Sequence, residues 1–216
     1  LIIVARTGDQ PGAKGISLIV AEVNGLPGFT RGRVLDKVGL DGQDTRELFF
    51  EDMRVPTENV LGGVEGQGFI QLMQQLPQER LSIAVGAYSQ AAAAVRFAQA
   101  YTQDRTIFGK TVASFQNSKF ELAACKAKVD AMESSVDRGL ELHDAGQLTA
   151  ADAASLKLFC TEAASEVIDR CLQLHGGYGY INEYPIARLY ADNRVNRIYG
   201  GTSEVMKTII AKDMGL

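Results

Sequence analysis

The spacing of hydrophobic and polar positions changes near residue 60, and this change divides the chain into two parts. Residues 1–6, 16–23, 30–38 and 45–52 are short runs rich in β-branched and aromatic side chains, separated by segments rich in glycine, proline and aspartate. Such runs are typical of β-strands joined by turns. Because no helical segment lies between them, the four predicted strands are expected to pair in an antiparallel manner.

Four strands are fewer than a closed barrel requires, so we expect half of a larger sheet, or a sheet that another chain completes. Residues 54–63 contain Pro56, Gly62 and Gly63, which end the strand pattern. The sequence therefore predicts two domains. Residues 1–60 form the C-terminal half of a β domain, and residues 61–216 form a helical domain.

Helical patterns fill the second part. Long helices are expected over residues 66–103, 115–144 and 149–174, and shorter ones over 185–193 and 202–213. Short loops between long helices favour an up-down four-helix-type bundle, so the predicted fold class is α+β and mostly α. In the first long helix, Pro77 removes a backbone hydrogen bond and favours a bend, and the small residues from Ala84 to Ala94 permit close packing.

Two apolar stripes are expected to face the core. The stripe on the second long helix consists of Val129, Met132, Val136 and Leu140, and that on the third of Leu156, Phe159, Ala163, Val167 and Leu174.

Composition excludes several classes of protein. The chain has 216 residues with 46% hydrophobic and 22% charged residues, as in an ordinary soluble domain. Its net charge is 22 − 26 = −4 without a basic run, so nucleic acid is not an expected partner. No apolar run is long enough for a transmembrane helix, and the first residues do not resemble a signal peptide.

The cysteines and histidines indicate a reducing compartment and no metal. Cys125, Cys160 and Cys171 form no CxxC pair and are predicted to be free core thiols. His143 and His175 have no partner at the spacing of metal ligands. We expect a cytoplasmic location, or the mitochondrial matrix if the source is eukaryotic.

The segment from Arg194 to Lys207 contains a Gly-Gly turn at the start of the last predicted helix. Gly200 and Gly201 can adopt backbone angles that other residues avoid, and they let a ligand approach the main chain. Thr202 or Ser203 can cap the following helix, whose N–H groups and positive dipole end suit an anionic or carbonyl ligand. An ordinary glycine turn between two helices is the alternative.

Two other segments could contact a ligand. In residues 104–110, Arg105 could bind phosphate with two hydrogen bonds and Phe108 could cover a ring; the alternative is a helix end with a buried anchor. In residues 173–179, a Gly-Gly-Tyr-Gly sequence follows a helix rather than a strand, so it is not a Rossmann fingerprint. His175 in this segment is expected to be structural.

Three motifs in this order resemble the acyl-CoA dehydrogenases, flavoenzymes that desaturate acyl-CoA thioesters. They are Arg-x-x-Phe-Gly-Lys at 105–110, Gln-Leu-His-Gly-Gly at 173–177 and Arg-Ile-Tyr-Gly-Gly-Thr-Ser-Glu at 197–204. The resemblance implies FAD as the cofactor. It implies that Arg105, Phe108, Gln173 and Gly177 contact the FAD of a neighbouring subunit, and that Thr202 and Glu204 also contact FAD.

The resemblance also implies where the catalytic base lies. Many members have an acidic residue after the Tyr of the last motif, where this sequence has Gly200. In the long-chain and isovaleryl types, which have Gly or Ala there, the base is a Glu before an Arg in the first long helix. Glu79 before Arg80 matches, although a solvated surface Glu is the alternative. Arg80, Tyr199 and Gly201 are the implied substrate contacts.

The implied reaction is the α,β-dehydrogenation of an acyl-CoA in fatty acid β-oxidation. The implied partners are acyl-CoA, an electron-transfer flavoprotein and further copies of the chain in a dimer of dimers. The family's N-terminal helical domain and the first half of its β domain have no counterpart here, so the chain alone is expected to be inactive. A non-catalytic helical assembly module and an acyl-CoA oxidase are the alternatives.

Overall fold

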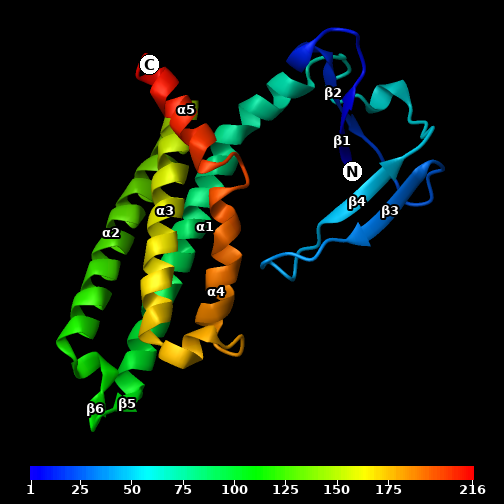
Figure 1. Cartoon of the computed structure of the whole chain (residues 1–216). Coiled ribbons are helices and arrows are strands. Elements are labelled where there is room, and N and C mark those ends of the chain that lie inside the picture. Colours follow the sequence, from blue (N-terminus) through cyan, green and yellow to red (C-terminus); the bar gives the residue numbers. More distant parts are fainter. The chain divides into compact units, whose positions relative to one another are not determined.

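The computed structural model describes all 216 residues and divides the chain into two compact units. The first comprises Leu1–Lys37 and Asp41–Gln75, and the second comprises Val38–Leu40 and Leu76–Leu216. Figure 1 shows the four strands of the first unit in blue and cyan and the helical bundle from green to red. The predicted domain boundary at residue 60 stays a prediction.

Four strands occupy the first unit, as the sequence predicts. Strand β1 (Ile2–Arg6) pairs antiparallel with β2 (Ile16–Val20), and β3 (Phe29–Val34) pairs antiparallel with β4 (Arg46–Phe50). The pairs form two separate two-stranded sheets, whereas the sequence analysis expected one. Both faces of β4 are exposed, including Phe49 and Phe50, although the Phe50 ring lies 5.4 Å from the ring of Phe29 on β3.

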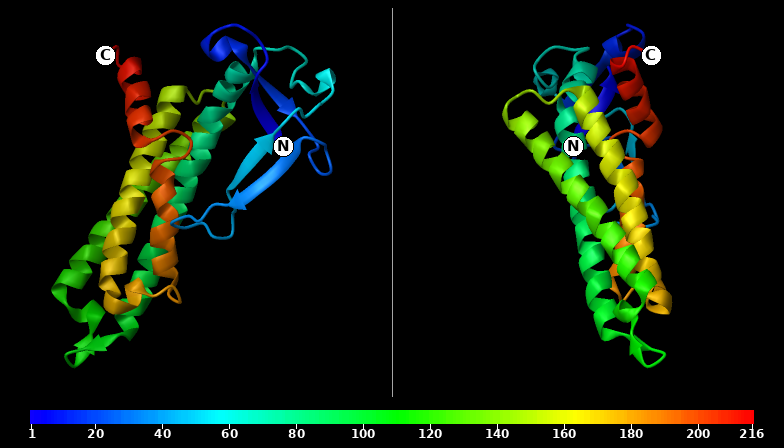
Figure 2. Two further views of the ribbon diagram at one scale, coloured as in Figure 1. Left: turned by 45° about the vertical axis from the view of Figure 1, so that its right-hand side comes forward. Right: turned by 90° about the vertical axis from the view of Figure 1, so that its left-hand side faces the viewer.

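Three long helices and two short ones follow. They are α1 (Gly68–Asp104), α2 (Gln116–Asp144), α3 (Ala150–Leu174), α4 (Pro185–Asn193) and α5 (Ser203–Asp213). The views in Figure 2 agree that α2 and α3 run side by side, and α3 also packs on α4 and α5. Helix α1 continues through Pro77 without a break in its assignment.

A short hairpin between α1 and α2 lies outside the sequence predictions. Strands β5 (Thr106–Ile107) and β6 (Lys110–Thr111) pair across Phe108 and Gly109, which both have positive φ values of 50° and 77°. Two such residues form the tight turn that matches the twist of paired strands. The turn therefore places Phe108 at the tip of the hairpin.

Small residues on α1 allow the bundle to close. Ala84, Ala87, Ala91, Ala94 and Ala98 are fully buried at alternating spacings of three and four residues, the repeat of a packed helix face. The cysteines and several apolar side chains of α2, α3 and α4 complete this core: Cys125, Val129, Met132, Val136, Cys160, Ala164, Val167, Ile168, Cys171 and Ile186. The prediction that the three cysteines lie in the core is confirmed.

Both predicted stripes are wrong at one position. Leu140 is 41% exposed and Phe159 is 43% exposed. On α2 the buried position is Gly139, where an added Cβ would lie 2.6 Å from Cδ1 of Leu156 and 2.8 Å from Cδ1 of Leu81. Close helix contact at this glycine turns Leu140 outward.

The helix caps agree with the sequence. Thr149 begins α3 with a capping box, in which its hydroxyl accepts from the Asp152 N–H at 3.1 Å and Asp152 accepts from the Thr149 N–H at 3.1 Å. Thr202 caps α5, and Glu204 lies in its first turn. None of the helices is long and apolar enough to cross a membrane.

Candidate active site

The Gly-Gly turn lies between a 3-10 turn at Arg194–Arg197 and helix α5. Gly200 and Gly201 have φ values of +65° and +100°, which disfavour any side chain. A Cβ at Gly200 would lie 2.5 Å from Cδ1 of Ile83, and one at Gly201 would lie 2.8 Å from Cε of Met206. The backbone angles therefore favour glycine at both positions, and a side chain there would also displace the ends of Ile83 and Met206.

Two buried cations hold the carbonyl groups of this turn. Nε of Arg80 on α1 donates to the Gly200 oxygen at 3.1 Å, and Nζ of Lys157 on α3 donates to the Gly201 oxygen. Arg80 is 5% exposed and Lys157 is not exposed at all. Burial lowers the pKa of both groups; the nearby Arg80 charge lowers that of Lys157 further, and Glu162 opposes the change.

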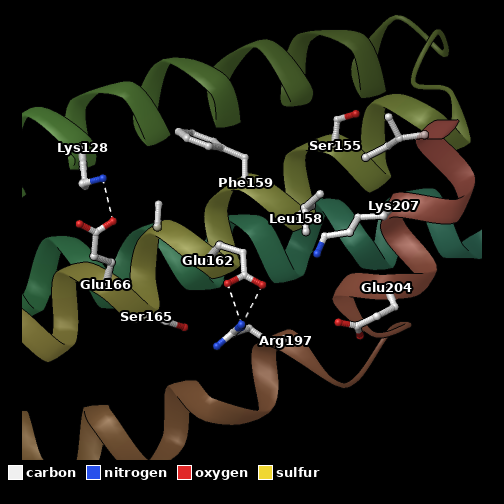
Figure 3. Close-up of a pocket in the computed structure, with 12 residues that line it drawn as sticks. Lys128, Ser155, Leu158, Phe159, Glu162, Ser165, Glu166, Arg197, Glu204 and Lys207 are labelled. Carbon is white, nitrogen blue, oxygen red and sulfur yellow. Dashed lines mark hydrogen bonds and ion pairs between the residues drawn. The ribbon is translucent and has the colours of Figure 1, made fainter. Parts of the chain in front are cut away.

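Glu162 of α3 joins the turn from its other side. It accepts from Nε of Arg197 at 2.9 Å and from the Ser203 hydroxyl at 2.7 Å. Its second oxygen lies 2.9 Å from Nη2 of Arg197. Figure 3 shows this pair, with Glu204 and Lys207 of α5 beside it along a groove of about 880 Å³. The segments before and after the two glycines are thus tied to one helix.

Buried amides support the segment that leads into the turn. Asn196 donates to Asn193 Oδ1 and to Gln90 Oε1, both at 3.0 Å, and accepts from the Tyr199 hydroxyl at 2.6 Å. Asn193 in turn donates to Ser165 at 3.0 Å. Burial raises the pKa of Tyr199, so its hydroxyl stays protonated as a donor to Asn196 at neutral pH.

Glu79 is exposed, unlike the Arg80 that follows it. Within this chain the Glu79 side chain therefore lies at the surface, as in the alternative of a solvated Glu. Ile83, one helical turn after Glu79, is the residue that meets Gly200. Positions four apart lie on one side of a helix, so Glu79 is on the side of α1 that faces the turn.

A second group of predicted residues lies at the far end of the bundle. Arg105, Gln173 and Gly177 line one pocket of about 600 Å³, together with Tyr101 and Tyr178. The Arg105 guanidinium lies 5.5 Å from the centre of the Tyr178 ring, within the range of a cation–π contact. Nothing lies within 4 Å of a Cβ added at Gly177, so the backbone there is open to a ligand.

Two residues of this end differ in their surroundings. Phe108 is 92% exposed at the hairpin tip and does not line the pocket, so the buried anchor considered as an alternative is wrong. His175 is buried, its Nδ1 lies 2.8 Å from the Cys171 oxygen, and its ring stacks on Tyr101 at 4.5 Å. These contacts agree with a structural role.

Comparisons with known proteins agree with this geometry. Residues 66–215 match the family profile for the C-terminal domain of acyl-CoA dehydrogenases. The chain belongs to the acyl-CoA dehydrogenase family. The resemblance of the three motifs is thereby confirmed.

Relatives of the long-chain and isovaleryl types are among the matches. The mitochondrial long-chain specific acyl-CoA dehydrogenase of Sus scrofa is 46% identical over 99% of this chain and 50% of its own length. The mitochondrial isovaleryl-CoA dehydrogenase of Oryza sativa subsp. japonica is 38% identical over 99% of this chain and 52% of its own length. The crystal structure of an acyl-CoA dehydrogenase from Geobacillus kaustophilus superposes with a TM-score of 0.95 and 46% identity. The match covers 100% of this chain and 57% of that one. The chain thus spans about half the length of the curated relatives it matches.

The acyl-CoA dehydrogenase motifs thus meet at two sites within this chain. Glu79, Arg80, Tyr199, Gly201, Thr202 and Glu204 belong to the glycine-turn end, and Arg105, Gln173 and Gly177 to the far end. Lys157, which contacts the turn, and Gln173 are 173 − 157 = 16 residues apart on α3, or about 24 Å at 1.5 Å per residue.

Sequence reasoning missed Lys157, Glu162 and Asn196. A lysine inside an apolar helix is usually expected to reach solvent, and a Glu or Asn has no distinctive spacing. Small residues surround Lys157 on α3, at Ala153, Ala154, Cys160, Thr161 and Ala164, and this was the available signal of a buried long side chain. No group of three or more His, Cys, Asp or Glu residues could hold a metal ion.

Proposed function

We propose that the complete protein containing this chain catalyses the FAD-dependent α,β-dehydrogenation of an acyl-CoA. The observation that carries the proposal is the glycine turn held beside the Glu79 side of α1, in a chain with family motifs at both ends of its bundle. FAD, when bound, supplies the hydride acceptor. Glu79 takes the α proton, and the amides of the turn bind the thioester carbonyl.

The far-end pocket has groups that suit the phosphate portion of a dinucleotide. Arg105 offers a guanidinium for phosphate, Gln173 an amide, and Gly177 an open backbone. Because this pocket and the glycine turn are about 24 Å apart along α3, we propose that Arg105, Phe108, Gln173 and Gly177 serve the FAD of a neighbouring copy. The exposed Phe108 at a hairpin tip suits such a contact.

From the family resemblance we further propose a dimer of dimers, with an electron-transfer flavoprotein as the acceptor of electrons. The chain alone is expected to bind FAD weakly, since it carries only these two partial sites. Titration of the 216-residue chain with FAD tests this expectation, and tight binding with turnover would contradict it.

The reaction is tested with the purified complete protein under anaerobic conditions. An acyl-CoA is expected to abolish the flavin absorption near 450 nm, and a 2-enoyl-CoA is expected to form. Absence of both reactions with short, long and branched acyl-CoAs contradicts the proposal and favours an assembly module. Rapid peroxide formation in air identifies an oxidase instead.

A further inference from the structure

Lys157 is a charged side chain in the middle of a helix core. It is fully buried, and it is the largest of the fully buried side chains. None of the ion pairs within 4.0 Å includes it, since the nearby Glu162 is engaged by Arg197 and Ser203. A buried cation without a carboxylate partner is costly, so its retention calls for a specific role. Its one polar contact is the carbonyl oxygen of Gly201.

The turn needs outside support because of its own sequence. Gly200 and Gly201 have the widest conformational freedom of any two consecutive residues, so nothing local decides which way their peptide groups face. Thr202 begins the helix, and its hydroxyl contacts the Val205 N–H at 3.4 Å and the Glu204 carboxylate, both on the helix side of the turn. The direction of each peptide group in the turn is therefore decided by whatever binds its carbonyl oxygen.

The two cations decide this direction. All peptide bonds are trans, so the C=O and N–H groups of one peptide unit point in opposite directions. Arg80 binds the Gly200 oxygen, which turns the Gly201 N–H away from Arg80, and Lys157 binds the Gly201 oxygen, which turns the Thr202 N–H away from Lys157. Neither N–H has a hydrogen-bond partner within the chain.

We propose that Lys157 is a positioning residue, whose buried ammonium group holds the Gly201 carbonyl inward and so directs the unpaired Thr202 N–H toward the ligand, while Arg80 sets the Gly201 N–H in the same way. It acts through the backbone of Gly201 and Thr202 and touches no reacting atom. Loss of the ammonium group lets the Gly201–Thr202 peptide rotate, because glycine permits either orientation. The activity readout below depends on the proposed function, whereas the exchange readout does not.

The test compares Lys157→Met with Lys126→Met in the complete protein. Met keeps an unbranched apolar side chain and removes the charge; Lys126 is exposed on α2 and makes an ion pair with Asp130 within the same helix. Hydrogen exchange is measured by NMR or mass spectrometry at Val205 and Met206. Their N–H groups bond the Thr202 hydroxyl at 3.4 Å and the Thr202 carbonyl at 3.0 Å.

If Lys157 positions the turn, exchange at these two amides rises at least ~10-fold in Lys157→Met but not in Lys126→Met, while exchange in the middle of α2 stays unchanged. An equal rise across the whole bundle overturns the proposal, because it shows only a global loss of stability. If Lys157→Met does not fold, the same comparison is made with Lys157→Gln, which removes the charge but keeps a donor.

The second readout uses a 3-thia-acyl-CoA, which has the thioester but no transferable hydride. The expected result for Lys157→Met is normal FAD content, weaker binding of this analogue and a kcat lower by roughly 10- to 100-fold, as for a displaced reacting group. Unchanged kcat and analogue binding per flavin overturn the positioning role. If the wild-type protein shows no acyl-CoA-dependent reduction, the proposed function fails, and the exchange comparison still decides the role of Lys157.

Discussion

Arg80 and Gly200 are joined by a hydrogen bond of 3.1 Å from the arginine Nε to the glycine oxygen, across 120 positions of the chain. This bond ties the helix that carries Glu79 to the turn that contains Gly200, the position where the resemblance implies an acidic residue in many members. Ile83 reinforces the junction, since its Cδ1 atom would lie 2.5 Å from a Cβ at Gly200.

Glu79→Gln in the complete protein is expected to lower kcat by at least ~10²-fold, because an amide cannot accept the α proton. FAD content and affinity for a 3-thia-acyl-CoA should stay near the wild-type values, since Gln has almost the same shape. Glu141→Gln, an exposed change on α2, is the control. Near-normal turnover of Glu79→Gln would reject the assignment and make Glu204 the next candidate.

Moving the carboxylate from position 79 to position 200 tests whether both positions reach the α carbon of the acyl-CoA. Glu79→Gly with Gly200→Glu is expected to recover part of the activity lost by Glu79→Gly, with a changed chain-length preference. Recovery should be small, because Gly200 has φ +65° and a Cβ there meets Ile83. Adding Ile83→Ala should increase the recovered activity, because it removes the side chain that a Cβ at position 200 would meet. If kcat of the triple variant stays at the level of Glu79→Gly, the two positions do not share a site.

Arg105 is expected to serve the cofactor of a neighbouring copy, and mixed assemblies reveal this. Arg105→Ala and Glu79→Gln are each expected to be impaired. A two-fold dimer can contain one Arg105→Ala copy and one Glu79→Gln copy. The site of the Arg105→Ala copy then has its own intact Glu79 and the intact Arg105 of its neighbour. Random co-expression should then restore about a quarter of wild-type kcat per subunit. No recovery above the separate variants would place Arg105 at its own subunit's cofactor.

His175 should make stability depend on pH. Burial, opposed by the hydrogen bond to Cys171, lowers the pKa of His175 below its ordinary value of 6.5. The unfolded chain therefore binds the proton more readily, so stability is lost as pH falls from about 6.5 toward the lower folded pKa. His175→Gln should flatten the dependence of Tm on pH in this window, although it lowers Tm by removing the stacking on Tyr101. An unchanged slope would contradict the prediction.

The three thiols should react only after unfolding. All are fully buried, and burial raises the pKa of Cys160 to about 12. The hydrogen bond from Cys171 lowers the pKa of Cys125, so for Cys125 burial alone keeps the reagent away. Since thiolates are the reactive form, an aromatic disulfide reagent at pH 8 should modify them at a rate independent of its concentration, set by opening of the bundle. A fast phase proportional to reagent concentration would show that a thiol is accessible in the folded protein.

The sequence alone determined the elements whose signals are local. Alternation and turn residues predicted the four strands, and long apolar periodicity predicted the helices, because these patterns reflect neighbouring positions on one strand or helix. A cap at Thr202 or Ser203 and Glu204 in the first turn followed from residue types that satisfy free amides, and the structure places the cap at Thr202. The three motifs also identified the family that the comparisons confirmed.

The tertiary structure decided what depends on distant parts of the chain. Only folding joins Lys157 of α3 to Gly201, and Arg80 of α1 to Gly200, and no local pattern marks a lysine as buried. Folding also exposes Leu140, because the close contact at Gly139 rotates the buried side of α2 by one residue. Hydrogen bonds and close packing between helices are set by three-dimensional proximity, which the spacing of residues along one helix does not encode.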